Sequence, residues 1–206
     1  LSGVVQLDSD ADHSCAVDGA GQVTCWGSNI MGQTNVPGTL TGVVEVALGS
    51  FHSCALDNSG QVTCWGGDND GQSTVPPGLN SVVRIDAGGS HTCALDAAGI
   101  VTCWGSNTSG QTSVPALTDV VDIFVGVFHT CALSSGGGLT CWGHNSFGQS
   151  TVPAGLSDVV SVGLGGFHSC ALDASGAVTC WGDNGHGKST VPAEATGAVS
   201  LAVGSH

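Results

Sequence analysis

The stretch that decides the fold is residues 43–81, VVEVALGSFHSCALDNSGQVTCWGGDNDGQSTVPPGLNS, because versions of it recur along the whole chain. Each copy has two cysteines ten residues apart, and Trp-Gly always follows the second cysteine. The pairs are Cys15 and Cys25, Cys54 and Cys64, Cys93 and Cys103, Cys131 and Cys141, and Cys170 and Cys180. They step by 39, 39, 38 and 39 residues, and a fixed period of this size indicates a repeat architecture.

The residues inside this unit predict short strands joined by tight turns. Residues 43–48 are rich in β-branched side chains, which suit a pleated sheet. Residues 52–57 and 61–65 read as two further strands around a three-residue hairpin loop that ends in Gly60. We expect residues 72–75 to add a short outer strand, since a proline such as Pro76 is tolerated at a sheet edge. No stretch has a sustained helical period.

Four short strands per 39 residues is the size of a propeller blade, and neighbouring blades must cover each other's faces. We therefore predict an all-β protein, a single β-propeller over residues 1–206 with one intrablade disulfide per repeat. The expected repeats are 4–42, 43–81, 82–119, 120–158 and 159–197, with a partial sixth at 198–206. His206 falls opposite Phe167 by the 39-residue step and matches His168 by residue type. We expect the natural protein to be longer, or its ring to be closed by other chains.

The repeat G-x-x-H-x-C-A-L-D-x-x-G-x-V-x-C-W-G-x-N-x-x-G-Q-x-x-V-P resembles the regulator-of-chromosome-condensation repeat over essentially the whole chain. Asp68 replaces the Asn in the second copy and Lys188 replaces the Gln in the fifth. The short period and residues 190–194, TVPAE, look most like the secreted bacterial β-lactamase-inhibitor propeller. This resemblance implies a ring of blades, seven in that propeller, and a rim that binds a protein target largely through aromatic side chains. Cysteine pairs are a departure, since the family commonly has Leu or Ala there.

The ten cysteines are expected to form five local disulfides. If the hairpin loop is centred on Ser59, Cys54 and Cys64 face each other across an antiparallel pair, close enough to be bridged. Each closed loop of 11 residues contributes about 2–3 kcal/mol on the chain-entropy model. The alternative is a metal site on His52, Cys54 and Cys64, but zinc usually takes four ligands and two-residue cysteine spacings are commoner. Free thiols are the third possibility.

Composition limits the partners and the compartment. Sixteen acidic residues against two basic ones give a net charge of −14, which repels nucleic acid and anionic lipid surfaces. No apolar run approaches the length that spans a bilayer, so we expect no membrane insertion. Paired cysteines persist in oxidising compartments, which predicts an extracellular or cell-surface protein, bacterial by the resemblance. The sequence begins at Leu1 without Met, as a mature or partial chain would.

The residue pattern does not favour catalysis. Each unit holds a His, a hydroxyl and an Asp, as in His52, Ser53 and Asp57, but adjacent strand residues point to opposite faces. Five equal sites are also unlike one special active site. The repeated histidines are expected instead to be buried residues that link blades, and the repeated tryptophans to be core anchors. We therefore predict a protein that is not an enzyme and has no cofactor.

Two acidic stretches are weak calcium candidates. Asp8, Asp10 and Asp12 alternate as calcium ligands do, although the Gly and Glu of the known loop are missing. Residues 68–71, DNDG, are a weaker candidate, and a solvated acidic turn is the simpler interpretation of both. Asn107-Thr108-Ser109 is a glycosylation sequon in a turn, of a kind that also arises by chance.

Positions that differ between copies are where a partner would bind. The residue before each repeated His and the turn after each Trp-Gly vary, and both should open onto one propeller face. The candidate contact residues are Phe51, Phe128, Phe167, Phe147, Ile30, Met31, Asp12 and Ser90. Aromatic and Met side chains are favoured in interface cores. The alternative is that these loops vary because nothing constrains them, with Phe packed under the next blade.

Two functions follow from these expectations. The first is a non-catalytic binding module that recognises a protein or glycan through the variable face. The second is a structural subunit of a surface coat or filament, assembled from copies of the chain. Strand pairing at the edges near Val4 and Leu201 would favour the second, because open sheet edges are templates for association.

Overall fold

The computed structural model describes residues 2–10 and 12–204, and it contains five antiparallel sheets of three strands each. The inner strands are β1 (Val4–Asp10), β4 (Val43–Leu48), β7 (Val82–Ala87), β10 (Val120–Val125) and β13 (Val159–Leu164). The middle strands are β2 (His13–Asp18), β5 (His52–Asp57), β8 (His91–Asp96), β11 (His129–Ser134) and β14 (His168–Asp173). The outer strands are β3 (Val23–Gly27), β6 (Val62–Gly66), β9 (Val101–Gly105), β12 (Leu139–Gly143) and β15 (Val178–Gly182). We number the sheets blade 1 to blade 5 in chain order.

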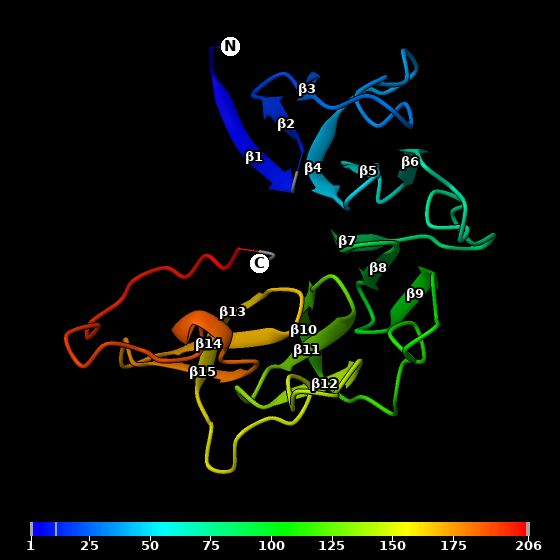
Figure 1. Cartoon of the computed structure of the whole chain (residues 1–206). Helices are drawn as coiled ribbons and strands as arrows, with labels where there is room; N and C mark the ends of the chain where they lie inside the picture. Colours follow the sequence, from blue (N-terminus) through cyan, green and yellow to red (C-terminus); the bar gives the residue numbers. More distant parts are fainter. Residues whose placement is uncertain (1, 11, 205–206) are drawn as a thin grey trace.

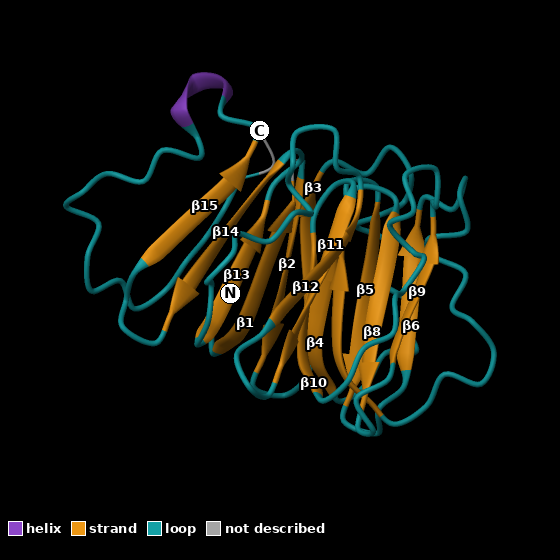
Figure 2. Cartoon of the chain, turned by 90° about the horizontal axis from the view of Figure 1, so that it is seen from below, coloured by secondary structure: helices purple, strands orange, loops and turns teal. Residues whose placement is uncertain are grey.

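The blades fan around a common centre, with the inner strands nearest to it (Figure 1). Seen from the side, the strands run between two rims of loops (Figure 2). One rim holds the turns from inner to middle strands and the loops that follow the outer strands. We call it the variable rim, because the positions that differ between repeats lie there. The other carries the hairpins between middle and outer strands. The propeller predicted from the repeat is confirmed.

The expected fourth strand is wrong. Residues 72–75 form turns in place of a strand, and each sheet consists of three strands in the described part of the chain. Gln72 is buried at 2% exposure, and its side-chain oxygen accepts a hydrogen bond from the backbone of Asp70, two residues earlier. This local bond curls the segment back onto its own loop, and Gly71 at φ +81° allows the tight turn. The segment is therefore not extended enough to pair with β6.

Every hairpin is closed by its own disulfide, as predicted. Cys54 and Cys64 are directly opposite partners in the β5–β6 register, with their Cα atoms 4.0 Å apart. The same pairing joins Cys15 to Cys25, Cys93 to Cys103, Cys131 to Cys141 and Cys170 to Cys180. No cysteine of the described residues is left free. The five disulfides indicate an oxidising environment.

Blades pack face to face through an apolar layer and one repeated polar relay. Between blades 1 and 2, for example, Val17 packs with Val43, Val46 and Trp65. The indole of Trp65 donates to the Gln33 carbonyl of blade 1 at 2.8 Å. Blades 3, 4 and 5 repeat this bond through Trp104, Trp142 and Trp181, at 2.8–2.9 Å.

The repeated histidines complete the relay, as predicted. His52 is fully buried, and its Nε2 lies 2.8 Å from the Thr92 hydroxyl of the next blade. That hydroxyl donates its proton to the Gln72 carbonyl at 3.1 Å, so it must accept from His52 Nε2–H. Equivalent bonds join His13 to Ser53, His91 to Thr130 and His129 to Ser169, at 2.8–2.9 Å. Each of these His–hydroxyl bonds therefore joins two neighbouring blades.

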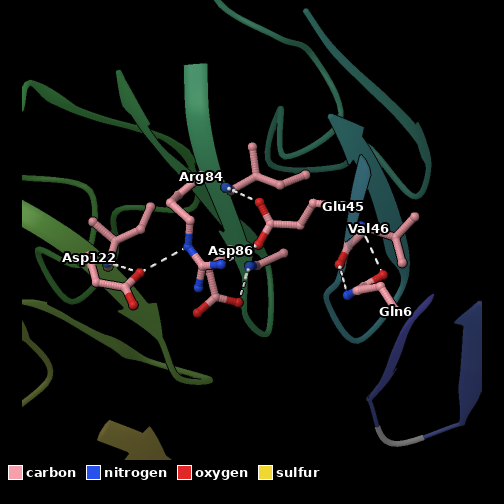
Figure 3. A network of polar contacts seen from close by, with 9 residues as sticks. Gln6, Glu45, Val46, Arg84, Asp86 and Asp122 are labelled. Atoms are coloured by element: carbon pink, nitrogen blue, oxygen red, sulfur yellow. Dashed lines mark hydrogen bonds and ion pairs between the residues drawn. The ribbon is translucent and has the colours of Figure 1, made fainter. Parts of the chain in front are cut away.

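Around the centre, side chains of the inner strands β1, β4 and β7 hold the backbone of the next inner strand, as Figure 3 shows for β1 and β4. Gln6 makes two bonds to the backbone of Val46, at 3.0 and 3.2 Å, and Glu45 accepts from the Ile85 amide at 3.1 Å. Arg84 then bridges Glu45 at 3.1 Å and Asp122 at 3.0 Å. One cation thus balances two carboxylates on neighbouring inner strands.

After the fifth repeat, the tail Ala198–Gly204 runs beside blade 5 in the place of a next inner strand. The Ala198 amide donates to the Gly176 carbonyl at 3.1 Å, just as Val159 donates to Gly137 at 3.3 Å. The tail forms no strand, so the strand pairing proposed at Leu201 has no strand to build on. His206, which was expected to match Phe167 or His168, lies outside the described residues. Within those residues, no helix is long and apolar enough to cross a membrane.

Candidate binding rim

The variable rim is built by a bond that ties its two loops together in every blade. The carbonyl of the residue before each repeated His accepts from the second residue after the Trp. In blade 2 this bond joins Phe51 to Gly67 at 2.7 Å, and in blade 4 it joins Phe128 to His144 at 2.9 Å. Two positions that vary between repeats are therefore held side by side by backbone bonds that any sequence can make.

The repeated Gln fixes the second loop from below. Gln149 is fully buried, and its side-chain oxygen accepts from the amide of Phe147 at 3.1 Å. The same bond reaches Met31 in blade 1 and Ser109 in blade 3. In blades 1–4 a constant buried Gln thus holds a variable residue at the loop tip. In blade 5, Lys188 replaces the Gln and pairs with Asp183 at 2.8 Å instead.

On blades 4 and 5 the rim residues gather into an aromatic cluster, Phe128, His144, Phe147 and Phe167. Phe128 stacks on Phe167 with ring centroids 5.2 Å apart, and Phe147 lies 5.3 Å from Phe167. The His144 ring packs edge-on against Phe167 at 5.4 Å. Phe147 is 53% exposed, Phe128 is 36% exposed and Phe167 is half-buried. Apolar rings are therefore presented to solvent at a rigid site.

The other predicted contact residues lie on the same rim but apart from this cluster. Phe51 and Met31, 38% and 44% exposed, lie near each other above Gly67, and Ile30 is 75% exposed. Asp12 is exposed and Ser90 is half-buried at the corresponding positions of blades 1 and 3. The structure thus gathers three of the eight predicted residues in the aromatic cluster and places two more, Phe51 and Met31, near each other. Whether any of the eight binds a partner stays a prediction.

His144 was missed by the sequence reasoning. It occupies the second position after the Trp, where the other repeats have Ser28, Gly67, Ser106 and Asp183. That position varies as much as the two that were singled out, and this variation is the signal that would have found it. Its Nδ1 accepts a hydrogen bond from the Gln149 side-chain amide at 2.6 Å, which fixes the ring in the cluster.

A cavity of about 560 Å³ lies at the centre, between the ends of the inner strands. Its lining includes Asp8, Asp10 and Asp86 together with Val127, the residue before Phe128 of the aromatic cluster. Burial raises the pKa of Asp86, and the nearby charge of Asp8 adds to this rise. The centre of the rim is therefore acidic and its flank over blades 4 and 5 is aromatic.

The calcium candidates are not gathered at one point. Asp8 accepts from the amides of Leu48 and Ser9 at 2.8 Å, and Asp12 does not line the cavity. Asp68 accepts from Ser73 and Thr74, the loop role that Asn plays in the other repeats. Among residues 2–10 and 12–204, no group of three or more His, Cys, Asp or Glu side chains is placed to hold a metal ion.

The sequon asparagine has a structural role of the same kind. Asn107 donates to the Ser113 hydroxyl at 3.0 Å and accepts from the Thr112 amide at 3.1 Å. A glycan attached to this nitrogen would replace only one of its two N–H hydrogens.

The surroundings of the buried histidines suit a structural role and not a catalytic one. Burial lowers the pKa of His52 to about 4 and of His91 to about 3, so both are neutral at pH 7. The hydroxyl beside each ring already donates to a backbone carbonyl, as Thr92 does to Gln72. A general base must accept the proton of the nucleophile, and here the hydroxyl already donates that proton to the backbone carbonyl.

Solved structures show where this fold has been seen. The ectodomain of the Physcomitrella patens receptor kinase CR4 is 28% identical, with a TM-score of 0.80 over 98% of this chain and 56% of that one. Prp20p of Saccharomyces cerevisiae, described with its binding properties to Gsp1p and histones, is 24% identical with a TM-score of 0.76. That match covers 87% of this chain and 58% of Prp20p, so the chain spans little more than half of either protein. A comparison with curated proteins finds no match.

The repeat itself identifies the family. The model of the regulator of chromosome condensation (RCC1) repeat matches residues 4–33, 43–72, 82–111, 120–149 and 159–188. Each match starts at the first residue of an inner strand and ends at the buried Gln or Lys of the rim loop. These matches take in all five blades and most of the chain, and the chain therefore belongs to the RCC1 repeat family.

Proposed function

We propose that this propeller is a non-catalytic binding module that holds a protein partner on its variable rim. The observation that carries the proposal is the exposed aromatic cluster Phe128, His144, Phe147 and Phe167. Solvent-exposed rings at fixed positions are the kind of surface from which interface hot spots are made. Two proteins of similar fold have related roles. Prp20p is described with binding properties to Gsp1p and histones, and the CR4 structure is the ectodomain of a receptor kinase.

The partner's chemistry follows from what lies around the cluster. The cavity beside it is lined by carboxylates, and the chain carries a net charge of −14. A partner surface that combines an apolar side chain with Lys or Arg would match both parts, and charge complementarity would speed its association. We therefore favour a basic protein segment over a glycan as the ligand.

The setting that we propose is outside the cell. Five disulfides in a chain of 206 residues suit a secreted or surface-held protein. A bacterial origin, and a relation to the secreted β-lactamase-inhibitor propeller, rest on the short repeat and on residues 190–194 and form part of this proposal.

The test is selection of ligands from a displayed random-peptide library on the wild-type chain, with a glycan array probed in parallel. We expect enriched peptides to combine aromatic or aliphatic residues with Lys or Arg. The triple variant F128S/F147S/F167S should bind them at least tenfold more weakly, as expected for loss of one or more hot-spot contacts.

The matched control is Ile100→Ser, which removes an exposed apolar side chain from the opposite rim and should leave binding unchanged. Peptides that bind the triple variant as well as the wild type would overturn the proposal. Enrichment on the glycan array alone would overturn the choice of a protein ligand.

A further inference from the structure

Three small pockets repeat along the molecule, one in each of blades 3, 4 and 5. Each pocket lies between the segment that leads into a blade and the hairpin of that blade's middle and outer strands. Their volumes are about 170, 200 and 240 Å³, in that order. All of their lining residues fall within residues 76–179, so the shape of each pocket is set by complete repeats of the chain.

Two parts of the lining are the same in all three pockets. A half-buried leucine of the leading segment forms an apolar wall and also packs on the blade core, as Leu79, Leu117 and Leu156 do. A threonine of the outer strand supplies a hydroxyl, at Thr102, Thr140 and Thr179. Every copy of the repeat has a threonine at this position. Within the described residues none of these three hydroxyls makes a hydrogen bond, so each is open to a ligand.

The third part, the residue at the start of the hairpin turn, differs between the pockets. It is Asp96 in blade 3 and Asp173 in blade 5, but Ser134 in blade 4. The amides of Ala98 and Ile100 both donate to Asp96 Oδ1, at 2.8 and 2.9 Å, and the hairpin bonds of Asp173 go to its Oδ1 as well. In blade 4 the Ser134 hydroxyl closes the hairpin at 3.1 Å. The hairpin therefore needs one oxygen only, and each aspartate brings a second oxygen and a charge to its pocket.

An apolar wall beside a carboxylate and a hydroxyl matches the chemistry of a lysine side chain. Lysine lays its methylene stem along apolar surface and keeps its ammonium, with three N–H donors, beside polar groups. No basic residue lines these pockets, and the net charge of −14 attracts cations. The pocket of blade 5 is also lined by Asp158, a second carboxylate, and should therefore hold an ammonium more tightly than the pocket of blade 3.

We propose that the pockets of blades 3 and 5 each bind a lysine side chain of a partner protein. In blade 3 the stem packs on Leu79, and the ammonium donates to the Asp96 carboxylate and to the Thr102 hydroxyl. The pocket of blade 4, which has Ser134 in place of the aspartate, takes no lysine. These sites lie beside the hairpins of the rim opposite the aromatic cluster, so they add a second binding surface to the one proposed above.

The experiment is an NMR titration of the ¹⁵N-labelled chain with Nα-acetyl-lysine methylamide. Amide signals of residues 96–102 and 173–179 should shift saturably, with tighter binding at 173–179, while those of 134–140 should not. Asp96→Asn keeps the Oδ1 acceptor of the hairpin but removes the charge. It should weaken binding at residues 96–102 at least tenfold and leave 173–179 unchanged. Ser134→Asp should create saturable binding at residues 134–140.

The matched control ligand is Nα-acetyl-norleucine methylamide, which has an aliphatic stem without the ammonium and should cause no saturable shift. An absence of saturable shifts with the lysine compound, equal shifts with the norleucine compound, or unchanged binding by Asp96→Asn would each overturn the proposal. Equal binding at residues 134–140 of the wild type would overturn it as well. F128S/F147S/F167S should bind the lysine compound as wild type does, so this proposal and the one for the variable rim can fail separately.

Discussion

One hydroxyl per interface, such as that of Thr92, joins three groups from two neighbouring blades. It accepts from His52, donates to the Gln72 carbonyl of its neighbour's loop, and lies beside the indole of Trp104, which bonds the same carbonyl. All of these groups are buried, so each would cost free energy without its partner. The repeat keeps Ser or Thr at this position in every blade because only a hydroxyl can both donate and accept there.

Thr92→Val should therefore destabilise the protein. Valine fills the same volume but leaves His52 Nε2–H without an acceptor, and we expect a loss of about 1–3 kcal/mol in the free energy of unfolding. Urea unfolding followed by Trp fluorescence measures this change. The matched control is Thr140→Val on β12, where the side chain faces solvent and the change should stay within about 0.5 kcal/mol. Equal midpoints for both variants would show that the relay contributes nothing to stability.

At this scale, sequence alone predicts the residues that repeat better than those that differ. The burial of His52 and the anchoring of Trp65 follow from five equal copies. The cluster formed by Phe128 and Phe167 does not, because it depends on two adjacent blades having large residues at the same loop position. His144 joins it through its backbone bond to Phe128, which only the folded rim reveals.

The hairpin is the element that the sequence predicts best. Cysteines ten residues apart with a Gly-ended loop between them can pair only in one simple register, and Cys54 does lie opposite Cys64. The fourth strand expected over residues 72–75 is predicted worst, because a short segment ending in Pro76 suits an edge strand as well as a loop. Its fate is decided by the burial of Gln72 and by the bond from its side chain to the Asp70 amide.

Removing one disulfide with the double variant C54A/C64A should lower the free energy of unfolding by about 2–3 kcal/mol, the value expected for an 11-residue loop. The four other hairpins keep their own bridges, so the fold should survive and the change is measurable by urea unfolding. An unchanged midpoint would contradict this account. Intact mass after alkylation is a companion check, since all ten cysteines should be protected until a reductant is added.

At the scale of the molecule, the buried histidines couple stability to pH. Burial lowers the pKa of His52 and His129 to about 4 and of His91 to about 3, from 6.5 in the unfolded chain. As pH falls below 6.5 the unfolded state takes up protons that the native state refuses. The contribution of these residues to the free energy of unfolding is therefore fully present above about pH 6.5, and it is lost as the pH falls towards 4.

Three acidic groups act in the opposite sense. Burial raises the pKa of Asp8, Glu45 and Asp86, so each binds a proton more readily in the native state and partly offsets the histidines as pH falls. The variant His91→Gln isolates one histidine. Its free energy of unfolding, measured by urea titration, should fall less steeply than that of wild type as the pH is lowered from 7.5 to 4.5. We expect the two slopes to differ by on the order of 1 kcal/mol per pH unit. Parallel profiles would show that His91 is not kept neutral by the fold.

Across the whole propeller, constant positions build the blades while the variable rim is left to meet a partner. The most direct test of this division is the affinity of a rim-selected peptide for the wild type, for F128S/F147S/F167S and for Thr92→Val. The urea midpoint of each protein is measured alongside. We expect F128S/F147S/F167S to lose at least tenfold in affinity, whereas Thr92→Val should lose stability and bind as wild type. Undiminished binding by the triple variant, or loss of binding by folded Thr92→Val, would contradict this division.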